Sequence, residues 1–197
     1  MTDEWRTLRN QSYLSHIAVP DLFSAMESAR VIGLCSQHPP EPGRTWNGTE
    51  YVVNAAGRSV ETAYIARSAE TAWIYDRMDE AFLRLAKVWG FDVRCTLEDL
   101  KYVRYQEGAH FMHWHMDTGP DYSNLRKLSM SVELNDSSEY EGGELQIFPI
   151  GGAHIAGPHR AAGTAVVFPS HSYHRVTPVT RGVRHVLVNW ISGPPLR

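Results

Sequence analysis

The chain has 197 residues and a formal net charge of −3, with 43% hydrophobic and 21% charged residues. This size and composition predict a globular unit with its own core, and we expect one domain over residues 1–197. The weak acidity counts against nucleic acid as the main partner, because counterion release needs a basic surface. An acidic start at residues 1–10 and the lack of long apolar runs predict a cytoplasmic protein that does not enter a membrane.

Two amphipathic helices are predicted in the first half of the chain. Residues 21–32 place apolar side chains at helical spacing, with Asp21 as the N-cap and Gly33 as the end. A longer apolar stripe over residues 68–89 lies between Ser68 as the cap and Gly90 as the stop. We expect both helices to pack against a sheet. Short β-forming segments at 51–54 and 61–65 predict edge strands.

Short β-forming runs separated by Gly, Asp, Asn and Pro follow residue 99. The seven runs are LKYVRYQEG, HFMHWHMD, RKLSMSVELND, GGELQIFPI, GTAVVFPS, SYHRVTPV and RHVLVNWIS. Over residues 128–134, apolar side chains alternate with Ser and Glu, so one face of that strand is apolar and the other polar. We therefore expect a mainly β fold, a double-stranded β-helix (jelly roll) with the two helices packed on it. Residues 1–98 would supply the helical support and edge strands, and residues 99–197 the jelly-roll core.

The segment HFMHWHMDTGP, residues 110–120, carries three histidines and an aspartate. Alternate residues of a strand point to the same side and lie about 6.6 Å apart, so His115 and Asp117 are able to reach one ion. His113 shares that side. A His-x-Asp pair alone is weak evidence, since a hydrogen-bonded turn explains it equally well.

A second group of residues strengthens the case for a metal site. His174 lies in a β-like run and Arg184 opens another, so two antiparallel strands joined by the TPVTRG turn would bring them together. Two imidazoles and one carboxylate form the facial triad of non-haem Fe(II) oxygenases. A nearby arginine would hold the far carboxylate of a bidentate organic acid. His171, at a strand entrance, is the alternative third ligand, and Arg181, in the turn, is the alternative anion ligand.

The chain resembles the Fe(II)- and 2-oxoglutarate-dependent dioxygenases, specifically the prolyl 4-hydroxylase-like branch, from about residue 73 to residue 197. The motifs that carry the resemblance are WIYDR, YQEGAHFMHWHMD, RKLSMSVELND, YEGGEL, GTAVVFPS, HRVTPVTRGVRHVLVNW and GPPLR. Bacterial and phage-type members look especially similar. The resemblance implies that His115, Asp117 and His174 bind iron, and that Arg184 binds the distal carboxylate of 2-oxoglutarate.

The same resemblance implies that Tyr105 and Trp190 line the cosubstrate pocket. Glu133 departs from the family pattern, because relatives often carry Tyr or Gln there and an ionised carboxylate only accepts hydrogen bonds. Glu133 then either turns elsewhere or pairs with Arg184 or with a basic group of the substrate. His113, on the ligand side of its strand, is the better candidate for a substrate contact.

The function implied by the resemblance is hydroxylation of an aliphatic C–H of an amino-acid residue, peptidyl or free, with proline the leading candidate. Fe(II), 2-oxoglutarate and O₂ would be required, with ascorbate as the reductant, and succinate and CO₂ would be released. Two other interpretations stay open: oxidative dealkylation of nucleic acid by the same iron chemistry, and a cupin-like metal-binding module without oxygenase activity. Arg184 distinguishes the metal-binding module from the two enzyme interpretations, because metal binding alone does not need an arginine. The sequence leaves the oligomeric state open.

Overall fold

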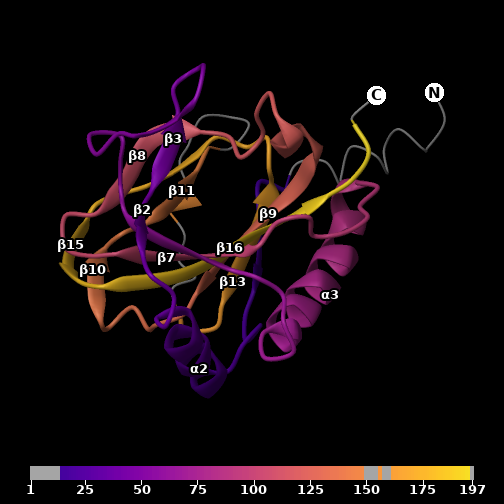
Figure 1. The fold of residues 1–197 in the computed structure, drawn as a ribbon. Coiled ribbons are helices and arrows are strands. Elements are labelled where there is room, and N and C mark those ends of the chain that lie inside the picture. The colour runs from indigo at the N-terminus through magenta and orange to yellow at the C-terminus, as the bar shows by residue number, and fades with distance from the viewer. Residues whose placement is uncertain (1–13, 149–154, 157–160, 196–197) are drawn as a thin grey trace.

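The structure is a computed structural model that describes residues 14–148, 155–156 and 161–195. Both ends of the expected domain, and the last two residues of the GPPLR motif, lie outside the described residues. Within them the chain is mainly β, with antiparallel sheets and two α-helices on the outside (Figure 1). Neither helix in this part of the chain combines the length and apolar character that crossing a bilayer requires.

The larger sheet of the described residues has seven strands. In spatial order they are β1 (Ile17–Val19), β13 (Ala165–Pro169), β9 (Arg126–Glu133), β16 (Arg184–Ser192), β7 (Leu100–Tyr105), β6 (Glu61–Ile65) and β2 (Glu41–Pro42). Neighbouring strands are antiparallel throughout. The long strands β9 and β16 therefore lie at the centre of the sheet, where they are paired on both sides.

A smaller, five-stranded sheet contributes the other side of the molecule. Its spatial order is β12 (Ile155–Ala156), β11 (Leu145–Ile147), β14 (His174–Val176), β8 (His110–His115) and β5 (Arg58–Ser59). Two further two-stranded sheets pair β10 (Tyr140–Gly142) with β15 (Val179–Gly182) and β3 (Arg44–Trp46) with β4 (Tyr51–Val53). A 3₁₀ turn covers Tyr122–Leu125. Each of the seven runs predicted after residue 99 contains a strand, and so do the two predicted edge segments.

Helix α2 (Ala25–Cys35) begins and ends later than the sequence predicted. Ser24, not Asp21, is the N-cap: its hydroxyl accepts from the Glu27 amide at 3.2 Å, and the Glu27 carboxylate accepts from the Ser24 amide at 2.8 Å. Asp21 has φ 53° and lies outside the helix. Gly33 does not stop the helix, which continues through it to Cys35.

Helix α3 (Ala72–Trp89) ends where the sequence predicted but starts later. Gly90, at φ 68°, is the left-handed C-cap that a glycine adopts without steric cost. The N-cap is Thr71 and not Ser68, whose carbonyl instead accepts the Ala72 amide at 2.8 Å. The expected stripe is buried, as shown by Ile74 and Met78, both at 0% exposure.

Two apolar cores lie on opposite faces of the larger sheet. The outer core joins both helices to that sheet, and its central sheet residues are Leu128, Met130, Val132, Leu187 and Ile191. The inner core lies between the two sheets, and it includes Val103 and Val186 from the larger sheet with Ile147 and Val176 from the smaller one. The helices therefore back the larger sheet, and the opposite face of the sheet is left to line a cavity.

Candidate metal centre and cavity

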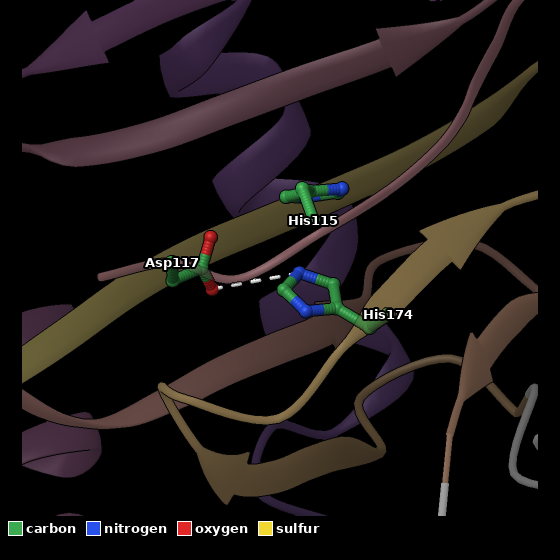
Figure 2. Close-up of side chains that lie close together, drawn as sticks. All are labelled: His115, Asp117 and His174. Carbon is green, nitrogen blue, oxygen red and sulfur yellow. Dashed lines mark ion pairs between the residues drawn. The ribbon is translucent and has the colours of Figure 1, made fainter. Parts of the chain in front are cut away.

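Three candidate ligands meet at the ends of two paired strands. His115 is the last residue of β8, Asp117 follows two residues later, and His174 is the first residue of β14. The register of these antiparallel strands makes His174 the direct partner of His115. The ligand atoms of the three side chains all lie within 4.8 Å of one another. Figure 2 shows the three side chains gathered together, with the ion pair between Asp117 and His174 dashed. The pairing of β8 with β14 thus joins residues nearly sixty positions apart.

The ring orientations leave both imidazoles able to coordinate a cation. Nδ1 of His115 lies 2.9 Å from the His113 carbonyl, and Nδ1 of His174 lies 3.0 Å from the Ser172 carbonyl. Because a carbonyl only accepts, both Nδ1 atoms must donate, which leaves the Nε2 lone pairs free for a metal. Nε2 of His174 lies 3.6 Å from Oδ2 of Asp117. Burial, together with the charge of His174, lowers the pKa of His115 to about 3, so this ring is neutral at physiological pH.

The Asp117 carboxylate is held in place from behind. Oδ2 accepts a hydrogen bond from the Ser129 hydroxyl at 2.6 Å, and Ser129 lies 3.0 Å from the Ser170 hydroxyl. Burial acts to raise the pKa of Asp117, but the two imidazoles, Arg126 and the Ser129 hydroxyl together hold it below its ordinary value. The side chain is therefore an ionised ligand with a fixed direction. Two imidazoles and one carboxylate are a donor set that suits Fe(II).

The triad opens into a cavity of about 730 Å³ between the two sheets. Arg184 also lines this cavity, but it does not reach it in the way the sequence predicted. The TPVTRG segment does not join two paired strands, because β14 belongs to the smaller sheet and β16 to the larger one. The intervening β15 pairs with β10 instead. His174 and Arg184 therefore face the same cavity from different sheets.

Arg184 and Glu133 form a buried ion pair, with exposed fractions of 1% and 4%. Nε of Arg184 donates to Glu133 Oε2 at 2.9 Å, and Nη2 donates to Oε1. The Tyr140 hydroxyl donates to Glu133 Oε2 at 3.0 Å. Nη1 of Arg184 is buried and has no hydrogen-bond partner among the described residues. The sequence left several alternatives open for Glu133, and the structure shows the pair with Arg184. Arg184 lines the cavity, whereas Glu133 is not among the residues that line it.

Tyr105 and Trp190 line the same cavity as the triad. The guanidinium carbon of Arg184 lies 5.2 Å from the Tyr105 ring centroid, and that of Arg126 lies 3.9 Å from the Trp190 ring. Burial raises the pKa of Tyr105, so its hydroxyl stays protonated and able to donate. Trp190 Nε1 is buried without a partner. Both aromatic residues thus present a polar hydrogen in the cavity region.

The remaining candidates separate clearly. His113 lines the cavity, and its ring packs so closely on Gly57 that a Cβ there would lie 2.5 Å from it. His171 lies outside the ligand cluster and makes an edge contact with the ring of Phe91, with ring centroids 6.2 Å apart. Arg181 is exposed and pairs with Glu141 at 2.9 Å. The alternative third ligand, His171, is therefore not part of the ligand cluster. The alternative anion ligand, Arg181, is bound to Glu141.

Several cavity residues escaped the sequence analysis. Ser129 was identified only as part of a polar strand face, although that alternation could have indicated a residue directed at the ligands. Arg126 donates from Nη1 to the Asp117 carbonyl at 2.8 Å and pairs with Glu98, a contact across 28 positions that no local pattern signals. Arg58 and Lys101 also line the cavity and gave no sequence signal.

Comparison with known proteins agrees with the motifs. Residues 100–192 match the family model described as the 2OG-Fe(II) oxygenase superfamily. A PKHD-type hydroxylase of Xylella fastidiosa (strain M23) is 40% identical over 101 residues, which are 46% of this chain and 43% of that protein. The chain therefore spans less than half the length of the first curated relatives it matches. The predicted resemblance to the Fe(II)- and 2-oxoglutarate-dependent dioxygenases is confirmed.

Solved structures show the same fold at low sequence identity. A prolyl-4-hydroxylase from Pseudomonas putida superposes with a TM-score of 0.73 at 19% identity, covering 91% of this chain and 93% of that one. A prolyl hydroxylase from Trichoplax adhaerens, solved with a hypoxia inducible factor peptide fragment, superposes with a TM-score of 0.74 at 13% identity, covering 96% and 92%. At these identities the likeness establishes the fold.

Proposed function

We propose that this chain, whose residues 100–192 match the 2OG-Fe(II) oxygenase superfamily, is an Fe(II)- and 2-oxoglutarate-dependent dioxygenase that hydroxylates an aliphatic C–H of an amino-acid residue. The substrate is peptidyl or free, with proline the leading candidate. The observation that carries the proposal is the convergence of His115, Asp117 and His174 at a cavity that Arg184 also lines. A metal-binding module would need the first three residues but not the arginine.

In this proposal each part of the cavity has a task. His115, Asp117 and His174 hold the iron, and the site, when loaded with 2-oxoglutarate and O₂, supplies an oxidation that yields succinate and CO₂ with the hydroxylated product. These three residues would bind the ion through two imidazole nitrogens and one carboxylate oxygen, and the donor set would leave further coordination positions for the cosubstrate and O₂. Arg184 holds the far carboxylate of 2-oxoglutarate through Nη1, its one nitrogen without a partner. Tyr105 and Trp190 shape the pocket around it.

The architecture supports the same assignment. We infer that the two facing sheets make up a double-stranded β-helix and that residues 1–197 form one domain. Strands β2, β5 and β6 from the first 98 residues join the sheets of the last 99, which supports a single unit. The PKHD-type and prolyl hydroxylase names of similar proteins support a peptide or amino-acid substrate.

Turnover of 2-oxoglutarate tests the proposal directly. Purified protein supplied with Fe(II), ascorbate as reductant and 2-oxoglutarate should form succinate slowly even without a substrate, and Asp117→Ala should abolish it. Mass spectrometry of peptide and amino-acid pools should then detect a gain of one oxygen, about 16 Da. A wild-type protein that binds zinc tightly and never consumes 2-oxoglutarate would show a binding module instead.

A further inference from the structure

Two basic side chains of the cavity lack an acidic partner. Arg58, on β5, is 8% exposed and lines the cavity. Its Nη1 donates to the Arg44 carbonyl at 2.7 Å, but its Nε is buried without a partner. Its guanidinium carbon lies 4.7 Å from the Phe111 ring centroid. Among the described residues Arg58 forms no ion pair, and its direct contacts are a carbonyl and an aromatic ring.

Lys101, on β7, is the second such residue. It shares the cavity face of its strand with Val103 and Tyr105. Its ammonium lies 5.7 Å from the Tyr64 ring centroid and 5.8 Å from that of Trp190, and within the described part of the chain it forms neither an ion pair nor a hydrogen bond. Burial and the charge of Arg58 hold the pKa of Lys101 well below its ordinary value. Arg58 and Lys101 therefore line the same cavity closely enough for their basic groups to interact.

Among the described residues, no carboxylate that lines the cavity forms an ion pair with Arg58 or Lys101. Glu98 lines the cavity but is bound to Arg126, and Asp117 is directed at His174 and Ser129. Glu41 is exposed at β2 and, among the described residues, forms no ion pair. Buried charges that lack a counter-charge cost several kcal/mol, and such groups in a cavity indicate a ligand of opposite sign.

We propose that Arg58 and Lys101 together form a subsite for one carboxylate group, distinct from Arg184, where β5 of the smaller sheet and β7 of the larger sheet both line the cavity. Arg184 already has a carboxylate partner in Glu133, whereas Arg58 and Lys101 have none in the part of the chain that the structure describes. Phe111 links the subsite to the triad, because it contacts the Arg58 guanidinium and stacks on the His115 ring, with ring centroids 3.6 Å apart. A small molecule is long enough to lie at both places.

The subsite deepens the proposed function and rests on it only for the source of the carboxylate. Since the proposed function assigns 2-oxoglutarate to Arg184, the carboxylate here comes from the substrate, as in a free amino acid or a chain-terminal residue. The other source of the same chemistry is the far carboxylate of 2-oxoglutarate itself. The two sources differ in which small molecule loses affinity when the subsite is removed.

Calorimetric titration of Lys101→Met and Arg58→Gln tests the subsite without turnover. Lys101→Met keeps the apolar stem between Tyr64 and Trp190 and removes an uncompensated charge, so this variant should fold at least as stably as the wild type. Lys87→Met on the outer helix α3 and Arg181→Gln on the surface are the matched controls. The first two probes are 2-oxoglutarate and 2-oxopentanoate, which lacks the far carboxylate of 2-oxoglutarate. The other two are propionate and propionamide, each added to Zn(II)-loaded protein that is already saturated with 2-oxoglutarate.

A substrate-carboxylate subsite predicts that propionate, but not propionamide, binds the loaded wild type and that both variants weaken it about tenfold, as expected for a lost charge-assisted contact. A subsite for the cosubstrate predicts instead that 2-oxoglutarate weakens by a similar factor while 2-oxopentanoate is unchanged. Unchanged affinity for all four probes, or an equal loss in the controls, would overturn the subsite. If the variants lose carboxylate affinity but the wild type forms no succinate, the subsite stands and the proposed function fails.

Discussion

In the proposed function, the pairing of Glu133 with Arg184 sets a particular condition on the binding of 2-oxoglutarate. A carboxylate that approaches Arg184 meets a guanidinium already bonded through Nε and Nη2 to Glu133, with only Nη1 free. An incoming anion is therefore attracted by Arg184 and repelled by Glu133. The pair also fixes the arginine side chain before any ligand arrives. Affinity for 2-oxoglutarate should then depend on Glu133 as strongly as on Arg184.

Replacement of Glu133 by Gln should strengthen 2-oxoglutarate binding and weaken the unliganded fold. Removal of the competing charge should lower the dissociation constant about tenfold. The unpaired Arg184 should cost roughly 3 kcal/mol of the free energy of unfolding, most of which saturating 2-oxoglutarate should restore. Calorimetry and urea unfolding measure the two effects, and Glu141→Gln, at an exposed ion pair, is the control. Weaker binding in Glu133→Gln would mean that Glu133 helps to hold the cosubstrate.

Ser129 should matter for metal affinity more than its neighbour on the same strand face. Its hydroxyl donates to Asp117 Oδ2, whereas Ser131, two residues along, lines the cavity without a hydrogen bond to a ligand residue. Loss of a contact that orients a metal ligand lowers affinity about tenfold or more. Ser129→Ala should therefore weaken Mn(II) binding in a chelator competition, and Ser131→Ala should not. Equal effects in both variants would show that the Ser129 bond does not orient Asp117.

At the scale of elements, the cap of α2 joins helix stability to pH. The Ser24 backbone amide, followed by Arg77, lowers the pKa of Glu27 from 4.5 to about 2. Because the folded pKa lies below the unfolded one, the contribution of Glu27 is complete above about pH 4.5 and disappears as the pH falls toward 2. Glu27→Gln should therefore destabilise the protein near pH 6 but match the wild type near pH 2. Urea unfolding across this range checks the slope, and a constant difference would contradict the ionic role.

The strands could be predicted from the sequence, but their partners could not. Each run after residue 99 became a strand because alternation and turn residues act locally. The sheet assignment of β14 and β16 failed because it depends on β15 pairing with β10, a contact between segments about forty positions apart. The helix starts failed for a related reason: Asp21 and Ser24 are both good caps, and the competition is decided by the reciprocal bond to Glu27.

The iron-ligand candidates were accessible from the sequence because a short motif and a family pattern both pointed to them. The structure brings His115, Asp117 and His174 together as that pattern implied. Arg58 and Lys101 were not accessible, since their significance lies in what surrounds them. A lone Arg or Lys in a strand is ordinary, and only the three-dimensional fold reveals that neither forms an ion pair within the described residues. The same holds for the Glu133 pair, which the sequence could offer only as one alternative.

At the scale of the whole molecule, a metal should stabilise the fold because its ligands come from separate strands. The site joins β8 to β14, and both strands help to close the cavity against the larger sheet. A ligand that binds only the folded state adds stability with its concentration, about 4 kcal/mol at a thousandfold excess over its dissociation constant. Zn(II), followed by 2-oxoglutarate, should therefore raise the melting temperature in two steps, and a chelator should reverse them.

Two variants test whether this stabilisation depends on the three candidate ligands. Asp117→Ala should lose the metal-dependent step, because two imidazoles alone bind the ion much more weakly. His171→Ala should keep it in full, since His171 packs against Phe91 and lies outside the ligand cluster. Differential scanning fluorimetry with a metal titration measures both. Loss of the step in His171→Ala with retention in His174→Ala would move the third ligand to the strand entrance, and the geometry of Figure 2 would then not be that of the metal-bound protein.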